Sequence, residues 1–147
     1  HELIDYFASL YGVSNQLLTE RKKYLFDLLD MNEFAHKRIG KLSTGMKQKV
    51  SICRTMIHDP EIVIFDEPTS GLDVITAESI IQLIRDCKAQ NKTVIFSSHI
   101  MGEVDLLCDN LAIIHKGEMK YQGSRQEFRE KMSEKSITAE FIKTVQA

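Results

Sequence analysis

The segment that most constrains the fold is a run of four apolar residues followed by two acidic ones, at residues 62–67. The run Ile-Val-Ile-Phe predicts a strand buried on both faces, as in a parallel sheet. Asp66 and Glu67 then stand at the carboxyl end of that strand, where open α/β sheets bind their ligands. Because adjacent carboxylates repel, we expect a Mg²⁺ ion held by Asp66 beside a phosphate, with Glu67 orienting or deprotonating a water molecule.

Hydrophobic periodicity divides the rest of the chain into helices and strands. The first 58 residues read as wholly helical, and beyond them strands and helices alternate, which predicts an α/β fold with a parallel sheet. Asp59-Pro60 ends the helical part. The expected helices span 1–12, 17–29, 43–57, 75–89, 101–107, 125–132 and 138–145, and the further expected strands span 93–96, 111–114 and 119–121.

The helix that begins after Leu42 carries the second candidate site. Ser43 is a favourable N-cap residue, and Gly45 allows a ligand to approach the backbone closely. The N-terminus of a helix presents unpaired N–H groups and a partial positive charge, which suit an anionic oxygen such as a γ-phosphate. Lys47 and Lys49 follow and add positive charge.

Two further segments follow strands of the predicted sheet. His99 comes after the strand at 93–96, so it lies at the same sheet edge as the two acids and could donate a hydrogen bond to a phosphate oxygen. The segment Ser70 to Asp73 forms a turn soon after the carboxylates. Taken singly, these features are better explained as a solvated strand end, a Ser-capped helix, an ordinary histidine and a plain turn.

Together, and in this order, the motifs resemble those of the ABC ATPases. Residues 42–46 resemble the signature motif, 62–67 the Walker B motif with its catalytic glutamate, 70–73 the D-loop, and His99 the switch histidine. Arg54, Pro60, Pro68 and Thr69 fit the running pattern of the family as well. The resemblance implies a partial P-loop NTPase (RecA-like) three-layer core with parallel strands, preceded by an all-helical subdomain.

The signature-like segment departs from the common pattern at two positions. Thr44 stands where a second glycine is usual, and Met46 stands where a glutamine is usual, so a side-chain amide contact is lost. Ser43 and Gly45, which would meet the phosphate, are kept. This Leu-Ser-Thr-Gly-Met variant resembles the sodium-extrusion and related efflux branch of the family.

No stretch of the sequence fits the phosphate-binding loop G-x-x-x-x-G-K-[ST]. Gly40-Lys41 is followed by Leu42, and Ala35 stands where the first glycine would be. We therefore expect a C-terminal part of the ATP-binding subunit, inactive alone and holding no cofactor tightly. Its expected parts are a partial helical subdomain at 1–58, the second half of the ATPase core at 59–124 and terminal helices at 125–147.

In this fold the phosphate-loop strand lies between the strands at 93–96 and 111–114, so its absence leaves backbone groups unpaired. We expect the chain to fill that place by closing the gap, by swapping, or by pairing with another copy.

The resemblance also implies partners. Two such subunits face each other head to tail, with ATP between them. Asp66, Glu67 and His99 would serve the chain's own ATP, Ser43 and Gly45 would contact the partner's ATP, and Asp73 would lie at the dimer interface. A transmembrane permease would complete an exporter of sodium or drugs, placing this subunit on the cytoplasmic face of the membrane.

Composition limits the alternatives. The net charge of −2 gives no reason to expect nucleic-acid binding, and no apolar run approaches the roughly 18 residues that span a bilayer. Three widely spaced cysteines indicate reduced, buried thiols in a cytosolic protein. Two alternative functions remain: a non-transport ABC ATPase of DNA repair or translation, and a noncatalytic interaction segment. The sequence indicates neither the transported substrate nor the direction of transport.

Overall fold

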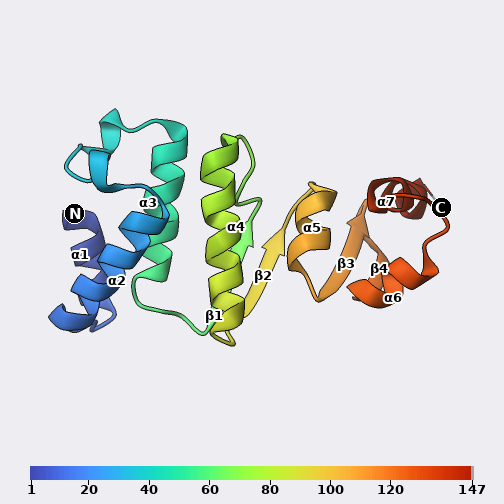
Figure 1. The fold of residues 1–147 in the computed structure, drawn as a ribbon, viewed down its shortest axis with the longest axis horizontal. Helices are drawn as coiled ribbons and strands as arrows, with labels where there is room; N and C mark the ends of the chain where they lie inside the picture. The colour runs from blue at the N-terminus through green and yellow to red at the C-terminus, as the bar shows by residue number, and fades with distance from the viewer. Residues whose placement is uncertain (147) are drawn as a thin grey trace. The chain divides into compact units, whose positions relative to one another are not determined.

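The computed structural model describes residues 1–146 and divides the chain into two compact units, His1–Ser97 and Ser98–Ala147 (Figure 1). The first unit begins with the helical part: α1 (Glu2–Leu10), α2 (Asn15–Leu28) and α3 (Thr44–Met56), with two short 3₁₀ turns, Asn32–Phe34 and Ile39–Lys41, before α3. The wholly helical start expected from the sequence is thereby confirmed.

Both longer helices of this part begin at a serine cap. The side chain of Ser14 accepts a hydrogen bond from the backbone N–H of Leu17, and that of Ser43 accepts one from Met46. Each cap satisfies one of the N–H groups that a helix start leaves unpaired. The predicted cap at Ser43 is confirmed, whereas α2 begins two residues earlier than its apolar periodicity suggested.

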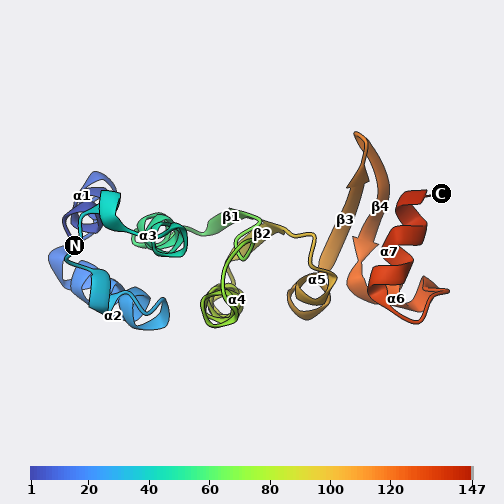
Figure 2. The ribbon, with the colours of Figure 1, turned by 90° about the horizontal axis from the view of Figure 1, so that it is seen from above.

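The parallel sheet of the first unit contains β1 (Ile62–Asp66) and β2 (Thr93–Ser97), joined by helix α4 (Val74–Ala89). Their register sets Ile64 opposite Ile95 and Asp66 opposite Ser97. Helix α4 packs beside the strands (Figure 2). The side chains expected to face inward from α4 are all buried: Ile80, Ile81, Ile84 and Cys87.

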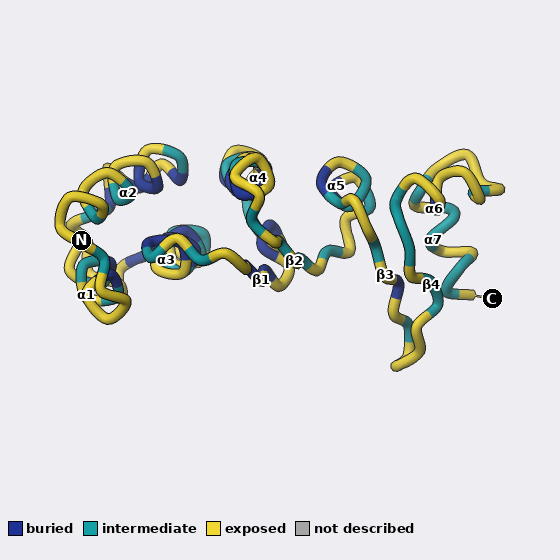
Figure 3. The backbone as a smooth tube through the Cα atoms, turned by 90° about the horizontal axis from the view of Figure 1, so that it is seen from below, coloured by how far each residue is buried: buried dark blue, intermediate teal, exposed yellow. Residues whose placement is uncertain are grey.

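The expectation that β1 is buried on both faces is wrong for the described residues. Val63 and Phe65 are buried, but Ile62 and Ile64 are 62% and 69% exposed. Figure 3 shows the mixture of buried and exposed residues at β1. On β2, Ile95 of the same face is 55% exposed. The reason is that α4 covers one face, while no described element of this unit covers the other. An apolar run indicates which surfaces are suited to burial, but it does not indicate whether another element covers them.

In the described part of the chain, β2 pairs with β1 and with no other strand. Closing the gap by pairing β2 with the strand at 111–114 is therefore not the outcome seen here. Swapping or pairing with a second copy involves another chain and stays a prediction.

The second unit contains α5 (Met101–Leu107), β3 (Asn110–His115), β4 (Glu118–Ser124), α6 (Arg125–Lys131) and α7 (Ile137–Gln146). Strands β3 and β4 form an antiparallel hairpin around Lys116 and Gly117, both with positive φ, 50° and 80°, as two-residue hairpin turns require. The ring of Phe128 on α6 packs edge-on against Tyr121 with centroids 4.8 Å apart. Asp105 on α5 pairs with Arg125 and Arg129 of α6.

The three cysteines form no disulfide. Cys53 and Cys87 are buried and Cys108 is half-buried. Burial raises the pKa of the Cys53 thiol to about 12, so it stays protonated. Over the described residues, no helix combines the length and apolar character needed to cross a bilayer.

Candidate functional site

The carboxyl ends of β1 and β2 bring the first site residues together. Ser97 Oγ donates a hydrogen bond of 2.6 Å to Asp66 Oδ1 and accepts one of 2.9 Å from the backbone N–H of Glu67. One hydroxyl therefore fixes both acidic residues at the end of the sheet. Asp66 and Glu67 are exposed, so their carboxylates are accessible from solvent.

Glu67 adopts an unusual backbone conformation. Its φ is +43°, in the left-handed region that residues with a side chain rarely occupy. A tight turn follows at once, in which the N–H of Ser70 donates to the carbonyl of Glu67 at 3.1 Å and that of Leu72 to Thr69 at 3.2 Å. Such strain persists only where surrounding contacts enforce it, and it is found often at functional sites.

The start of α3 forms the second candidate site. Ser43 is exposed and occupied as the helix cap, while Gly45 follows as the second helical residue. A Cβ built on Gly45 would lie 3.6 Å from Leu72 Cδ2, an ordinary contact distance. Packing within the chain therefore tolerates a side chain at position 45, and the helix itself would prefer one. Lys47 is exposed, but Lys49 is buried, with 8% exposure.

Asp73 caps the next helix. Its carboxylate accepts from the backbone N–H of Thr76 at 2.9 Å and from the Thr76 hydroxyl at 2.8 Å. These hydrogen bonds, the backbone one first, hold the pKa of Asp73 below its usual value. The two residues that follow are exposed apolar ones, Val74 at 85% and Ile75 at 77%.

His99 lies two residues beyond β2 and belongs to the second unit. Its neighbour Ser98 fixes the local chain, because its hydroxyl donates to Glu103 at 2.8 Å and accepts from the N–H of Ile100 at 3.0 Å. The imidazole of His99 is exposed. Its convergence with Asp66 and Glu67 stays a prediction.

Ser97 is the site residue whose role sequence reasoning missed. In the segment Ser97-Ser98-His99, the sequence pattern assigns a chemical role to the histidine and none to the first serine. The signal was available, because Asp66 and Ser97 are the last residues of two adjacent parallel strands, and such residues meet at one sheet edge.

The residues at the end of β1 suit Mg²⁺ only in part. Among the described residues, no group of three or more histidine, cysteine or acidic side chains could hold a metal ion. Mg²⁺ beside phosphates normally uses one or two carboxylates and takes its remaining ligands from phosphate and water. Asp66, exposed and fixed by Ser97, fits that limited role.

The chain is similar in sequence to ABC transporter ATP-binding proteins. The ABC transporter family profile matches residues 10–70. The chain is 41% identical over 141 residues to the ABC transporter ATP-binding protein NatA of Bacillus subtilis, covering 96% of this chain and 56% of that protein. It is 33% identical to a fluoroquinolones export ATP-binding protein of Mycobacterium tuberculosis, covering 96% of this chain and 46% of that one.

A solved structure described as an ATP binding subunit of an ABC transporter superposes with a TM-score of 0.88 at 26% identity. That match covers 97% of this chain and 60% of the solved one. The chain belongs to the family of ABC transporter ATP-binding proteins. It spans about half the length of the curated relatives that it matches.

Proposed function

We propose that this chain provides the catalytic carboxylates of an ATP-hydrolysing subunit that drives an ABC exporter. The observation that carries the proposal is the end of β1, where Ser97 fixes Asp66 and the backbone of strained Glu67 at one exposed sheet edge. Phosphoryl transfer uses an acidic residue to hold its metal ion and a second residue to position its nucleophile, and two adjacent acids at a strand end suit these two tasks.

Each residue has a distinct task in this proposal. Asp66 helps to hold Mg²⁺, which neutralises charge on the phosphates when it is bound. Glu67 orients or deprotonates the attacking water. His99 donates a hydrogen bond to the terminal phosphate. The ordering of Asp66 by Ser97 before ATP arrives lowers the reorganisation needed at the moment of reaction.

The start of α3 serves the ATP of a second subunit. Ser43 and the backbone at Gly45 present N–H groups at a helix N-terminus, a favourable place for a phosphate. The absence of a side chain at position 45 supports this role, since the chain's own packing leaves room for one. A ligand that approaches the backbone accounts for the glycine.

The head-to-tail partner is supported by the surface beside Asp73. Val74 and Ile75 expose their apolar side chains to 85% and 77%, a cost that burial against another subunit would remove. A transmembrane permease is the second proposed partner, which places this subunit at the cytoplasmic face of the membrane. The similarity to an export ATP-binding protein favours export over import.

A chimaera tests the proposal. In the NatA chimaera, this chain replaces the matching 141-residue region of Bacillus subtilis NatA, whose remainder we expect to supply the phosphate-binding loop. We expect the chimaera to hydrolyse ATP in the presence of Mg²⁺, and the chain alone to show negligible turnover. A folded chimaera that binds ATP without hydrolysing it, or turnover by the chain alone that Glu67→Gln abolishes, would contradict the proposal.

A further inference from the structure

The loop at residues 57–61 connects the two candidate sites of the first unit. It joins the end of α3, whose start carries Ser43 and Gly45, to the start of β1, whose end carries Asp66 and Glu67. Asp59 lies at the centre of this loop with φ of +59°, an uncommon conformation for a residue with a side chain. Contacts that hold this loop therefore set the direction of α3 relative to β1.

The carboxylate of Asp59 binds one cation with each oxygen. Oδ2 accepts from Arg21 of α2 at 3.2 Å, and Oδ1 pairs with Lys92, just before β2, at 2.6 Å. These three residues, here called the Asp59 bridge, come from a helix of the helical part, from the loop and from the edge of the sheet. One side chain thus joins the helical part to both strands of the first unit.

The same two cations also hold the backbone on either side of Asp59. Arg21 donates to the carbonyl of Ile57 at 3.3 Å, and Lys92 donates to that of Pro60 at 3.0 Å. The Lys92 side chain is only 10% exposed. A largely buried ammonium group is costly unless it is paired, so Lys92 strongly favours the conformation that keeps Asp59 and Pro60 in place.

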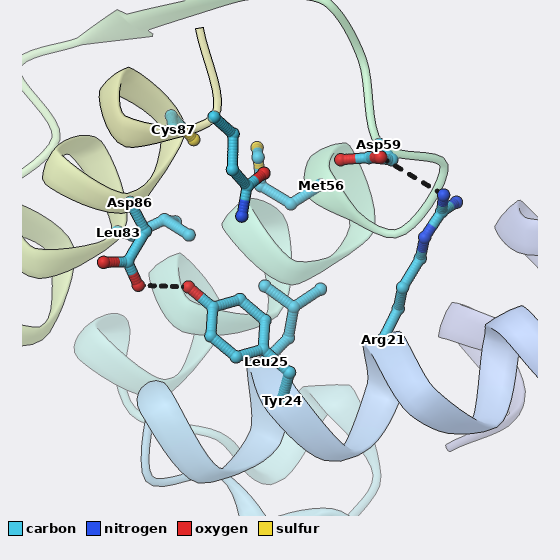
Figure 4. A pocket seen from close by; sticks show the side chains of 9 residues that line it. Arg21, Tyr24, Leu25, Met56, Asp59, Leu83, Asp86 and Cys87 are labelled. Carbon is cyan, nitrogen blue, oxygen red and sulfur yellow. Dashed lines mark hydrogen bonds and ion pairs between the residues drawn. The ribbon is translucent and has the colours of Figure 1, made fainter. Parts of the chain in front are cut away.

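A partly open cavity borders the Asp59 bridge. This cavity of about 180 Å³ lies between α2, the end of α3 and α4, with Leu25, Met56 and Leu83 in its lining. Figure 4 shows the Arg21–Asp59 pair on one side of this cavity and the hydrogen bond from Tyr24 to Asp86 on the other. The apolar side chains at this junction are buried, with Leu25 at 2% and Leu83 at 1% exposure, so the polar contacts add to their packing in fixing the alignment.

We propose that Asp59 is a positioning residue, which sets the orientation of helices α1–α3 relative to strands β1 and β2 by binding Arg21 and Lys92 together. The geometric part of this proposal stands alone, while its effect on ATP turnover rests on the proposed function. In the proposed function, Asp59 touches no reacting group. Its loss should therefore lower kcat for ATP and change KM little.

The orientation can be measured in the full chain as the distance between two spin labels, after Cys108 is replaced by serine. The labels are attached at two exposed positions, Lys47 on α3 and Thr93 on β2. Asp59→Asn removes the charge with a residue that tolerates the left-handed backbone. We expect a shifted or broadened distance distribution. The matched control is Glu78→Gln, which breaks an exposed 3.2 Å pair with Arg85 within α4, and it should leave the distribution unchanged.

A double variant separates positioning from plain stabilisation. Asp59→Asn combined with Lys92→Met removes the unpaired buried charge, so we expect its urea midpoint to return toward that of the unchanged chain. The distance distribution should stay altered, because the connection to α2 is still missing. If the double variant restores both quantities, or if Asp59→Asn alters neither, the proposal is overturned. Should Asp59→Asn fail to fold, Arg21→Gln gives the same test from the α2 side of the bridge, at a cation more exposed than Lys92.

Turnover in the NatA chimaera supplies the functional part of the test. We expect Asp59→Asn to lower kcat about tenfold, since misplacing reacting groups by about 1 Å can cost up to ~10²-fold, and to leave KM within about twofold. An unchanged kcat alongside an altered distance distribution would overturn the link to turnover. A chimaera without substitutions that hydrolyses no ATP would refute the proposed function, while the distance measurements would still decide the geometric claim.

Discussion

Ser97 and Asp66 are joined by a 2.6 Å hydrogen bond in which the serine hydroxyl donates to the carboxylate at the shared end of β1 and β2. Because the same hydroxyl accepts from the N–H of Glu67, it orders the residue proposed to hold Mg²⁺ and the residue proposed to activate water. The site is thereby arranged by a neighbouring strand as well as by the strand that carries it.

Ser97→Ala removes both hydrogen bonds. We expect a loss of roughly 1 kcal/mol in the free energy of unfolding, less than the ~1.5–3 kcal/mol typical of a bond to a charged group, because the site is exposed. In the NatA chimaera it should also raise the Mg²⁺ concentration needed for half-maximal hydrolysis. Thr93→Val, which removes a hydroxyl from the same face of β2, is the control. Equal effects of the two substitutions would show that the Ser97 hydroxyl has no special role.

Gly45→Ala should separate folding from function. The built Cβ meets only Leu72 Cδ2, at 3.6 Å, and alanine favours helix over glycine by up to about 1 kcal/mol. We expect an unchanged or higher urea midpoint together with a large loss of ATP hydrolysis in the chimaera, because the methyl group blocks the approach of a phosphate. Gly102→Ala, at the second position of α5 with open space around it, is the matched control. Full activity of Gly45→Ala would remove the start of α3 from the site.

His58 should make stability depend on pH. Its ring stacks on Tyr11 with centroids 3.8 Å apart, and burial, followed by the charge of Arg21, lowers its pKa from the usual 6.5. The unfolded chain then binds the proton more readily, so His58 favours folding fully above about pH 6.5 and loses this contribution as the pH falls toward the lower folded-state pKa.

His58→Phe keeps a ring to stack on Tyr11 and removes the titration. Urea midpoints measured at about pH 7.5 and pH 5.5 should fall less in this variant than in the unchanged chain. An identical fall in both proteins would mean that other groups cause the pH dependence.

The bare face of β1 and β2 should make the isolated chain associate. Ile62, Ile64 and Ile95 expose apolar side chains on one side of the sheet, and β2 has an edge that pairs with no described strand. Sedimentation velocity should show dimers or larger species that become scarcer at lower concentration. Ile64→Thr, which keeps a β-branched residue, should shift the population toward monomer. A chain that is monomeric at all concentrations would contradict the prediction of swapping or pairing.

Local features explain what the sequence could reveal. The Ser43 cap, the inward face of α4 and the position of the acids at the carboxyl end of β1 depend on residues close in the chain, and each was predicted correctly. The Asp59 bridge was not, because Arg21 and Lys92 lie 38 and 33 residues away and nothing local marks their meeting. Burial of β1 was overestimated because apolar composition does not reveal which neighbours cover a strand.

The most direct test of the account compares two glutamates at opposite ends of β1. In the NatA chimaera at saturating ATP and Mg²⁺, Glu67→Gln should slow hydrolysis by roughly 10² or more, the scale of losing a general base, while ATP binding is retained. Glu61→Gln, at the other end of the strand and also exposed, should leave the rate unchanged. Hydrolysis at the unchanged rate in Glu67→Gln, or an equal loss in Glu61→Gln, would contradict the assignment of this sheet edge as the site of ATP hydrolysis.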